Sequence, residues 1–334
     1  MDCLIIANAI QSSKTSRYWA RKKKYILNCF SNAEVIIPDG LLPKRVLANK
    51  EYDCIILIGD DKFFNSIINQ IFPIPSTAEK KNLLALIPDR RNSAIANSLY
   101  LPNDLKSILD LIKKKQYIPI DVIRCHLINK RGFPDDFIVI NDVLIGIPEL
   151  KLPLALRTLA SIAKTPLALS SENRLKTIQL LSNGDEIYNG SYVFSTILLG
   201  NKLSNGPKIH SRRRINANCF EYYQLNSRKI KDLTGTLTHF LKGDEPINSS
   251  NLFREKFTEL TVKGESIENY IVGDGIDMGR LPATFTLLSK AIKVISPSIT
   301  VRIKQAWKNG IVQAKYPKPV GSRNSMKSTK DSSF

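Results

Sequence analysis

One stretch of the chain reads Tyr52-Asp-Cys-Ile-Ile-Leu-Ile-Gly-Asp-Asp-Lys-Phe-Phe-Asn-Ser-Ile-Ile-Asn-Gln-Ile-Phe72. Its apolar run at 54–58 is rich in β-branched residues, which is typical of a buried strand. After Gly59-Asp60-Asp61, apolar residues at 64, 67, 68 and 71 recur with the period of a helix. In α/β proteins a strand, a turn and a helix in this order place ligands at the carboxyl end of the strand. A plain tight turn with a helix N-cap is the alternative interpretation.

The segments on either side of this stretch extend the same alternation. Strand-like runs at 4–7, 33–37 and 83–87 are separated by helical patterns at 15–30 and after Asn103, which is the expected cap of its helix. Strands that alternate with helices favour a parallel sheet with right-handed crossovers. We therefore predict an α/β domain over residues 1–119.

The pattern changes near residue 120. Short β-rich runs follow at 118–124, 137–140, 142–145, 177–181, 192–199, 219–225, 259–262 and 291–295, with one helical segment at 153–164. These runs predict a β-rich second domain over 120–298. From 299 to 334 the chain is basic and loses its periodicity, so we expect a mostly disordered tail.

The composition is that of a globular protein of ordinary hydrophobicity. Hydrophobic residues make up 43% of the 334 residues and charged residues 24%. No apolar run has the length of a membrane helix, and the first residues lack the pattern of a signal peptide. The five cysteines are scattered and form no Cys-x-x-Cys pair. We expect reduced thiols and a cytoplasmic protein, with no disulfide framework and no zinc site.

The charge is strongly positive. Lys and Arg exceed Asp and Glu by 19, with clusters at 21–24, 113–115 and 212–214 and in the tail. A positive excess of this size indicates a polyanionic partner, either nucleic acid or an anionic membrane surface. Arg212, Arg213 and Arg214 are our candidates for contact with an anionic head group or membrane, although a solvated loop explains such a run equally well.

The order of these segments resembles the catalytic domains of the diacylglycerol kinase family, the soluble lipid kinases that also include sphingosine kinase. Asn8-Ala-Ile-Gln-Ser12 stands where the family has Asn-Pro-x-Ser-Gly, and the stretch 59–69 aligns without gaps with its Gly-Gly-Asp-Gly-Thr signature. The stretch 87–102 aligns with its Ile-Pro-x-Gly-Thr motif. Weaker matches complete the series at Pro119-Ile-Asp121, Gly200-Asn201, Asp274-Gly275 and 288–297.

The resemblance implies a Rossmann-like nucleotide-binding domain at 1–119 and a β-sandwich-like lipid domain at 120–298. It implies the phosphorylation of a lipid hydroxyl with ATP and Mg²⁺, by a protein that associates peripherally with membranes. The cofactor-binding candidates at the positions of the family's motifs are Asn8, Gly59, Asp61, Lys62, Arg90, Arg91 and Asp274, with Asp61 also the metal ligand.

Departures from the family pattern fall on the chemistry. Asp60 and Lys62 replace two glycines of the phosphate-binding turn, and Arg90-Arg91 replace Gly-Thr. The family's Asp-Asp-Gly, which is expected to supply a general base, corresponds to 212–218, a stretch without a carboxylate. No catalytic residue is therefore assigned.

Two outcomes stay open. In one, Lys62, Arg90 and Arg91 replace backbone amides as phosphate contacts in a divergent kinase. In the other, the fold persists as a pseudokinase that binds lipid, an anionic membrane or a partner without turnover. A basic nucleic-acid-associated protein is the weakest alternative, because no recognised nucleic-acid module is present.

Overall fold

The computed structural model describes residues 1–10, 14–42, 52–72, 82–89, 93–146, 176–192, 194–204, 215–226, 252–264 and 269–298. Residues Met1–Ser298 form one compact unit. The tail predicted at 299–334 and the helical segment predicted at 153–164 lie outside the described residues.

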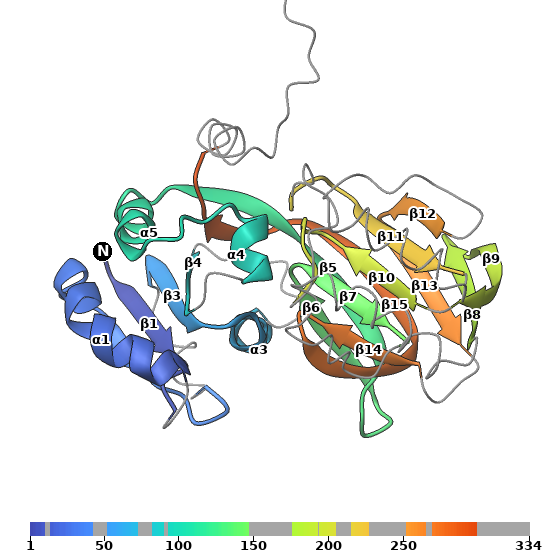
Figure 1. Cartoon of the computed structure of the whole chain (residues 1–334), viewed down its shortest axis with the longest axis horizontal. Coiled ribbons are helices and arrows are strands. Elements are labelled where there is room, and N and C mark those ends of the chain that lie inside the picture. Colours follow the sequence, from blue (N-terminus) through green and yellow to red (C-terminus); the bar gives the residue numbers. More distant parts are fainter. Residues whose placement is uncertain are drawn as a thin grey trace, which may run out of the picture. The chain divides into compact units, whose positions relative to one another are not determined.

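Four strands at the amino-terminal end of the chain form the predicted parallel sheet (Figure 1). The order across the sheet is β2-β1-β3-β4, so the chain begins at an inner strand. Continuous apolar sequence explains why β1 and β3 are buried along their whole length on both faces. The strand bounds are β1 Cys3–Ala7, β2 Glu34–Ile36, β3 Cys54–Gly59 and β4 Leu83–Pro88.

Helices cover both faces of these strands. α1 (Lys14–Cys29) and α5 (Leu105–Lys113) pack on one face, where Trp19 and Ile108 are buried against the strands. α3 (Asp61–Ile71) packs on the other face with its predicted apolar stripe. The short helix α4 (Ala94–Ser98) was not predicted. Asp104, and not Asn103, caps α5, because its carboxylate accepts a hydrogen bond of 2.8 Å from Ser107 N.

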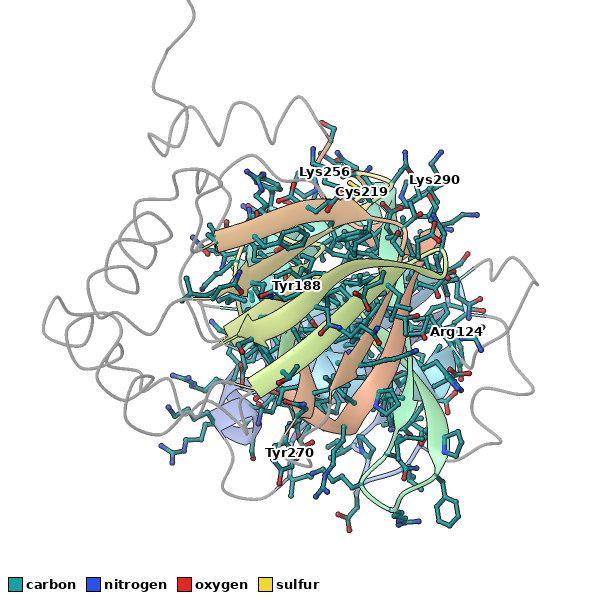
Figure 2. The ribbon with its side chains drawn as sticks, turned by 90° about the vertical axis from the view of Figure 1, so that its right-hand side faces the viewer. Arg124, Tyr188, Cys219, Lys256, Tyr270 and Lys290 are labelled. Atoms are coloured by element: carbon teal, nitrogen blue, oxygen red, sulfur yellow. The ribbon has the colours of Figure 1, made fainter. Side chains whose placement is uncertain are left out.

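The rest of the unit is rich in strands that pair antiparallel with one another. Figure 2 looks onto this part of the unit, where Arg124 lies on β5, Tyr188 on β9, Lys256 on β12 and Tyr270 on β14. The bounds are β5 Tyr117–Ile128, β6 Pro134–Val139, β7 Asp142–Ile145, β8 Lys176–Ser182, β9 Asp185–Tyr192, β10 Phe194–Leu198, β11 Phe220–Leu225, β12 Leu252–Phe257, β13 Glu259–Gly264, β14 Tyr270–Gly273 and β15 Ile276–Ile295.

The longest strand joins the two sets of strands. β15 has 20 residues and pairs with β14, β13 and β5, and its end pairs parallel with β4 at Val294 and Leu84. The sequence predicted only its last segment, at 291–295. Polar residues break the apolar run at Ser289 and Lys290, where Lys290 has a positive φ of 52° and the pairing with β5 shifts register. A bulge thus continues the strand through sequence that looks like a loop.

The fold is therefore a mixed sheet with a parallel segment, further antiparallel strands and few helices. One hydrophobic cluster runs from α3 into the strand-rich part, through residues such as Phe64, Ile138 and Phe285. The division into domains at 119/120 stays a prediction. None of the helices in the described residues has the length and apolar character needed to cross a bilayer.

Candidate functional site

The carboxyl ends of β1, β3 and β4 meet at one edge of the sheet. Asn8 N donates a hydrogen bond of 3.0 Å to Ile58 O, and Asp89 N donates one of 3.0 Å to Gly59 O. Thr15 Oγ1, at the start of α1, donates to Asp89 Oδ2 at 2.5 Å. The strand that follows β1 in the sequence, β2, lies on one side of it, and the next strand, β3, lies on the other. Open α/β sheets bind ligands at the point where the strand order reverses in this way.

The turn between β3 and α3 is closely packed and acidic. A Cβ on Gly59 would lie 2.6 Å from Phe63 Cδ1, so the glycine lets the aromatic ring fold back over the turn. Asp60 is the N-cap of α3 and accepts a hydrogen bond of 3.0 Å from Phe63 N. The stretch is therefore both a tight turn with a helix N-cap and a strand–turn–helix unit at the edge where α/β sheets bind ligands, so one geometry accommodates both interpretations. The cap also places a carboxylate where a phosphate would meet the helix N-terminus.

Asp61, the next residue, faces the segment after β4. One of its carboxylate oxygens accepts a short hydrogen bond from Ser93 Oγ, and the other accepts one of 2.7 Å from Ala94 N. Burial raises the pKa of Asp61, although both hydrogen bonds act in the opposite direction. Asp61 thus holds the start of α4 against the start of α3.

The turn between β14 and β15 approaches the first turn of α3 from the strand-rich part. Lys62 is exposed, and its Cε lies 3.4 Å from the position that a Cβ on Gly275 would take. The neighbouring Asp274 is fully buried. Its carboxylate accepts hydrogen bonds of 2.8 to 3.1 Å from Asn65 Nδ2, Ile140 N, Asn141 N and Asp142 N.

A second buried carboxylate lies beside Asp274. Asp142 Oδ1 accepts hydrogen bonds from Asn141 Nδ2 at 2.6 Å and from Ser204 N at 3.1 Å. Asp142 Oδ2 accepts none from any residue that the structure describes. Burial raises the pKa of both carboxyls, and the charge of Asp142 raises that of Asp274 further. Sequence reasoning missed Asp142; the signal was an acidic residue inside the apolar run 137–145.

Gly200-Asn201, the predicted Gly-Asn match, completes this polar cluster. A Cβ on Gly200 would lie 2.0 Å from Asn141 Oδ1 and 2.2 Å from Ser98 Oγ. Ser98 Oγ in turn donates to Asn141 Oδ1 at 2.7 Å and accepts from Asn201 N at 3.1 Å. Glycine is required here because two buried side chains occupy the space that a side chain would need.

The structure brings five of the seven cofactor-binding candidates to this edge. Asn8, Gly59 and Asp61 follow β1 and β3, while Lys62 lies beside the turn that carries Asp274. The remaining candidates, Arg90 and Arg91, and the proposed head-group residues Arg212, Arg213 and Arg214, lie outside the described residues.

The residues that follow the arginine run in the sequence are described from Ile215 onward. Asn218 N, four residues beyond Arg214, donates a hydrogen bond of 2.8 Å to Asp121 Oδ2. Asp121 is fully buried and also accepts one of 2.9 Å from Lys290 N. Asp121, the last residue of the Pro119-Ile-Asp121 match, therefore links the segment 215–218 to the bulge of β15 through hydrogen bonds.

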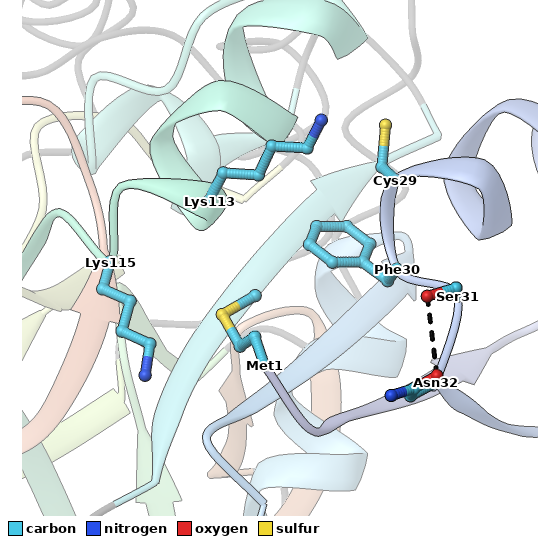
Figure 3. Close-up of a pocket in the computed structure, with 7 residues that line it drawn as sticks. All are labelled: Met1, Cys29, Phe30, Ser31, Asn32, Lys113 and Lys115. Carbon is cyan, nitrogen blue, oxygen red and sulfur yellow. Dashed lines mark hydrogen bonds between the residues drawn. The ribbon is translucent and has the colours of Figure 1, made fainter.

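Two cavities lie at opposite ends of the parallel strands. One of about 360 Å³ adjoins the candidate site at Asp89 and is also lined by Tyr18, Arg21 and Asn97. The other, of about 190 Å³, lies at the amino-terminal ends of the strands between Met1, Phe30 and Lys113 (Figure 3). Asn8, Gly59 and Asp61 lie at the carboxyl ends, so of these two cavities the larger one is nearer to the candidate site, although none of the three residues lines it.

A metal ion at this edge would need phosphate and water oxygens beside the carboxylate of Asp61. Within the described residues, no group of three or more His, Cys, Asp or Glu side chains is placed to hold a metal ion. Mg²⁺ in phosphate-binding sites commonly takes one or two carboxylates and completes its shell with phosphate and water oxygens. A carboxylate has about four lone-pair positions, so Asp61 retains acceptor capacity beyond its two hydrogen bonds.

Comparison with known proteins gives one consistent result. A Bacillus subtilis (strain 168) protein named diacylglycerol kinase is 24% identical over 272 residues, which cover 80% of this chain and 85% of that protein. A crystal structure attributed to a diacylglycerol kinase of Bacillus anthracis str. Sterne superposes with a TM-score of 0.67 at 16% identity, over 90% of this chain and 98% of that one. An NAD kinase from Archaeoglobus fulgidus, solved with ATP, gives a TM-score of 0.50 at 12% identity over 92% and 98%. No family model matches the sequence.

Proposed function

Because this chain belongs to the diacylglycerol kinase catalytic-domain family, we propose that it binds Mg·ATP at the carboxyl edge of β1, β3 and β4 and phosphorylates a lipid hydroxyl. The strand-rich part would then be the β-sandwich-like domain that receives the lipid. The observation that carries the proposal is the position of Asp61. It lies at the start of α3, at the edge where a doubly wound sheet binds its ligand.

In this proposal Asp61 holds the metal ion, and Lys62 contacts the phosphates. Mg²⁺, when bound with ATP, neutralises charge that develops on the phosphoryl group. Lys62 is exposed beside the Asp274-Gly275 turn and can reach an anion at this edge. Arg90 and Arg91 are the further candidates for phosphate contact, and Arg212, Arg213 and Arg214 for contact with an anionic head group.

Turnover is expected to be slow. The stretch 212–218 offers no carboxylate to accept the proton of the lipid hydroxyl. Loss of a general base typically costs about 10²- to 10⁴-fold in rate. Positioning and electrostatic stabilisation supply most of the catalysis in phosphoryl transfer, so activity can persist without that base.

The second candidate is a relative that binds a lipid or partner without turnover. The Asp60 cap favours it, because that carboxylate occupies Phe63 N and repels an incoming phosphate. The two candidates differ in one measurable property, the binding of Mg·ATP.

The first test is thermal stability with and without millimolar Mg·ATP. A ligand at about 100 times its dissociation constant stabilises the native state by about 2.7 kcal/mol. We expect a shift of several degrees in the wild type and none in Asp61→Asn. Ser93→Ala is the matched control, because it removes a hydrogen bond to Asp61 and keeps the carboxylate. If Mg·ATP does not change the melting temperature of folded wild-type protein, the proposal of nucleotide binding is wrong. The second candidate, a protein that binds a lipid or partner without turnover, is then favoured.

A lipid-kinase assay then completes the test. Transfer of labelled phosphate from ATP to a short-chain, water-soluble diacylglycerol separates chemistry from membrane binding. We expect transfer by the wild type and by Ser93→Ala, and loss in Asp61→Asn. Nucleotide binding without transfer to any acylglycerol or sphingoid acceptor would contradict the kinase proposal.

A further inference from the structure

The segments after β1 and β2 and the β5–β6 hairpin carry exposed apolar side chains. Eight large apolar side chains are exposed within the described residues. Four of them lie in these segments and the hairpin, and these are Ile10, Ile37, Leu41 and Phe133. Leu41 is 80% exposed and Phe133 is 65% exposed, the highest values of the eight.

The β5–β6 hairpin carries Phe133 at its tip. Its sequence, Asn129-Lys-Arg-Gly-Phe-Pro134, places two cations beside the aromatic ring. Figure 1 draws the hairpin as a green loop that extends beyond the neighbouring strands, and in Figure 2 it lies below the labelled Arg124. Basic residues next to an exposed aromatic side chain are typical of segments that enter the interface of a bilayer.

The tip is held in one conformation by its first residue. Asn129 Oδ1 accepts hydrogen bonds from Arg131 N at 2.9 Å and Phe133 N at 3.2 Å. Asn129 N donates to Phe133 O at 2.8 Å, and Gly132 N donates to Asn129 O at 2.9 Å. Gly132 has a φ of +83°, which a side chain would strain. These hydrogen bonds hold Phe133 in its exposed position before binding. A tip that is already ordered loses little conformational entropy when it binds.

The tip is connected to the candidate site through two contacts. Lys130 Nζ forms an ion pair of 2.9 Å with Asp277 Oδ2, three residues after Asp274. The intervening Gly275 lies against Lys62. A surface bound at the tip therefore lies next to the turn that borders the site.

We propose that the tip of the β5–β6 hairpin, with Phe133 inserted and Arg131 at the head groups, docks the protein on a bilayer that contains anionic lipid. The net charge of +19 of the whole chain favours such a surface, although Asp135 and Asp136 balance the charges of Lys130 and Arg131 within the hairpin. The proposal rests on the proposed function in one respect. A lipid kinase must bring its site to a hydroxyl at the membrane interface.

The test is flotation of the full chain with vesicles of phosphatidylcholine and phosphatidylserine in equal parts, without nucleotide. We expect Phe133→Ser to lower the partition coefficient about tenfold, since it removes the side chain that enters the bilayer. Arg131→Gln should lower it about fivefold, the effect of one cation near an anionic surface. Ile187→Ser, at an exposed position on β9, is the matched control and should bind like the wild type.

A second variant tests the proposal if Phe133→Ser folds poorly, because it gains a fluorescence signal and keeps an aromatic side chain at the tip. Phe133→Trp should bind at least as well as the wild type, and its added fluorescence should shift to the blue with vesicles and be quenched by brominated lipid. The chain has two tryptophans of its own, so the variant is made in a Trp307→Phe background, and the buried Trp19 should contribute no such change.

Three outcomes would overturn the docking proposal. They are wild-type binding by Phe133→Ser, an unchanged emission in Phe133→Trp, and a change of oligomeric state in Phe133→Ser, which would assign the tip to a second copy. Because no nucleotide is present, each of these outcomes leaves the proposed kinase activity to be judged by its own assay.

Discussion

Asn65 Nδ2 lies 2.8 Å from Asp274 Oδ2, although 209 positions separate the two residues in the sequence. Asn65 belongs to α3, and Asp274 to the turn before β15. The same Nδ2 donates to Ile138 O at 2.9 Å. This buried contact joins the helix that begins the candidate site to the strand-rich part of the unit.

Because this contact is buried, we expect the free energy of unfolding to depend on Asn65. Asn65→Ala removes one donor from Ile138 O, which keeps the hydrogen bond from Asn69 Nδ2, and one from Asp274, which keeps three backbone donors. A hydrogen bond to a charged group contributes about 1.5 to 3 kcal/mol. We expect urea denaturation to show a loss of about 2 to 3 kcal/mol in the free energy of unfolding. Ser66→Ala, at an exposed position on the same helix, should change it by less than about 0.5 kcal/mol. Equal effects of the two variants would show that the contact contributes little.

The buried carboxyls Asp142 and Asp274 should make stability depend on pH. Their pKa values are raised in the folded protein, so the native state binds protons more tightly than the unfolded chain above the ordinary carboxyl value of 3.8. Stability from these groups is therefore greatest in acid and is lost as the pH rises from about 4 toward neutrality. Each unit of pKa shift corresponds to about 1.4 kcal/mol.

Asp142→Asn tests this sign. It keeps an oxygen for Asn141 and Ser204 and removes the charge that raises the pKa of Asp274. We expect the variant to be more stable than the wild type at pH 8. We also expect its melting temperature to vary less between pH 5 and pH 8, the range of about 3 pH units in which the two buried carboxyls of the wild type lose their protons. A profile parallel to that of the wild type would contradict the assignment.

Gly200 should tolerate no side chain. The nearest atoms, Asn141 Oδ1 and Ser98 Oγ, are buried and bonded to each other, so neither can move without a lost hydrogen bond. Gly200→Ala should lower the free energy of unfolding by about 1 to 3 kcal/mol, the usual cost of overpacking. Gly190→Ala is the comparison, because its Cβ would meet one half-buried side chain, Tyr188, which can shift at the cost of its hydrogen bond to Ser191 O, so we expect a smaller loss. Guanidinium denaturation of both variants makes the comparison.

The strands of the parallel sheet could be predicted from the sequence because continuous apolar runs such as 54–58 have one structural solution in a buried sheet. The bulge at Lys290 and the short helix α4 could not, because their residues have no periodic pattern of their own. Long-range contacts select those conformations. The same holds for the polar cluster: Asp142 and Asn65 become recognisable only when β7, α3 and the Asp274 turn meet.

The site residues show a similar limit. Gly59 and Asp61 could be found because they stand between a strand and a helix, a local signal. The role of Asp60 as the cap of α3 was one of two interpretations, and the sequence offered no means to choose between them. The Asp60 carboxylate, if it repels phosphate, does so through its charge, which a neutral isostere removes.

Asp60→Asn measures the effect of that charge. Asparagine caps a helix about as well as aspartate, so stability should change little, while the charge beside the phosphate site disappears. One unit charge at several Å near a protein surface contributes on the order of 1 kcal/mol, so the dissociation constant for Mg·ATP should fall about fivefold. Lys62→Gln, which removes the opposite charge from the same turn, should raise it by a similar factor. Isothermal titration of the two variants gives both values. Equal affinities would place the phosphates away from the start of α3 and remove Lys62 from the list of phosphate contacts.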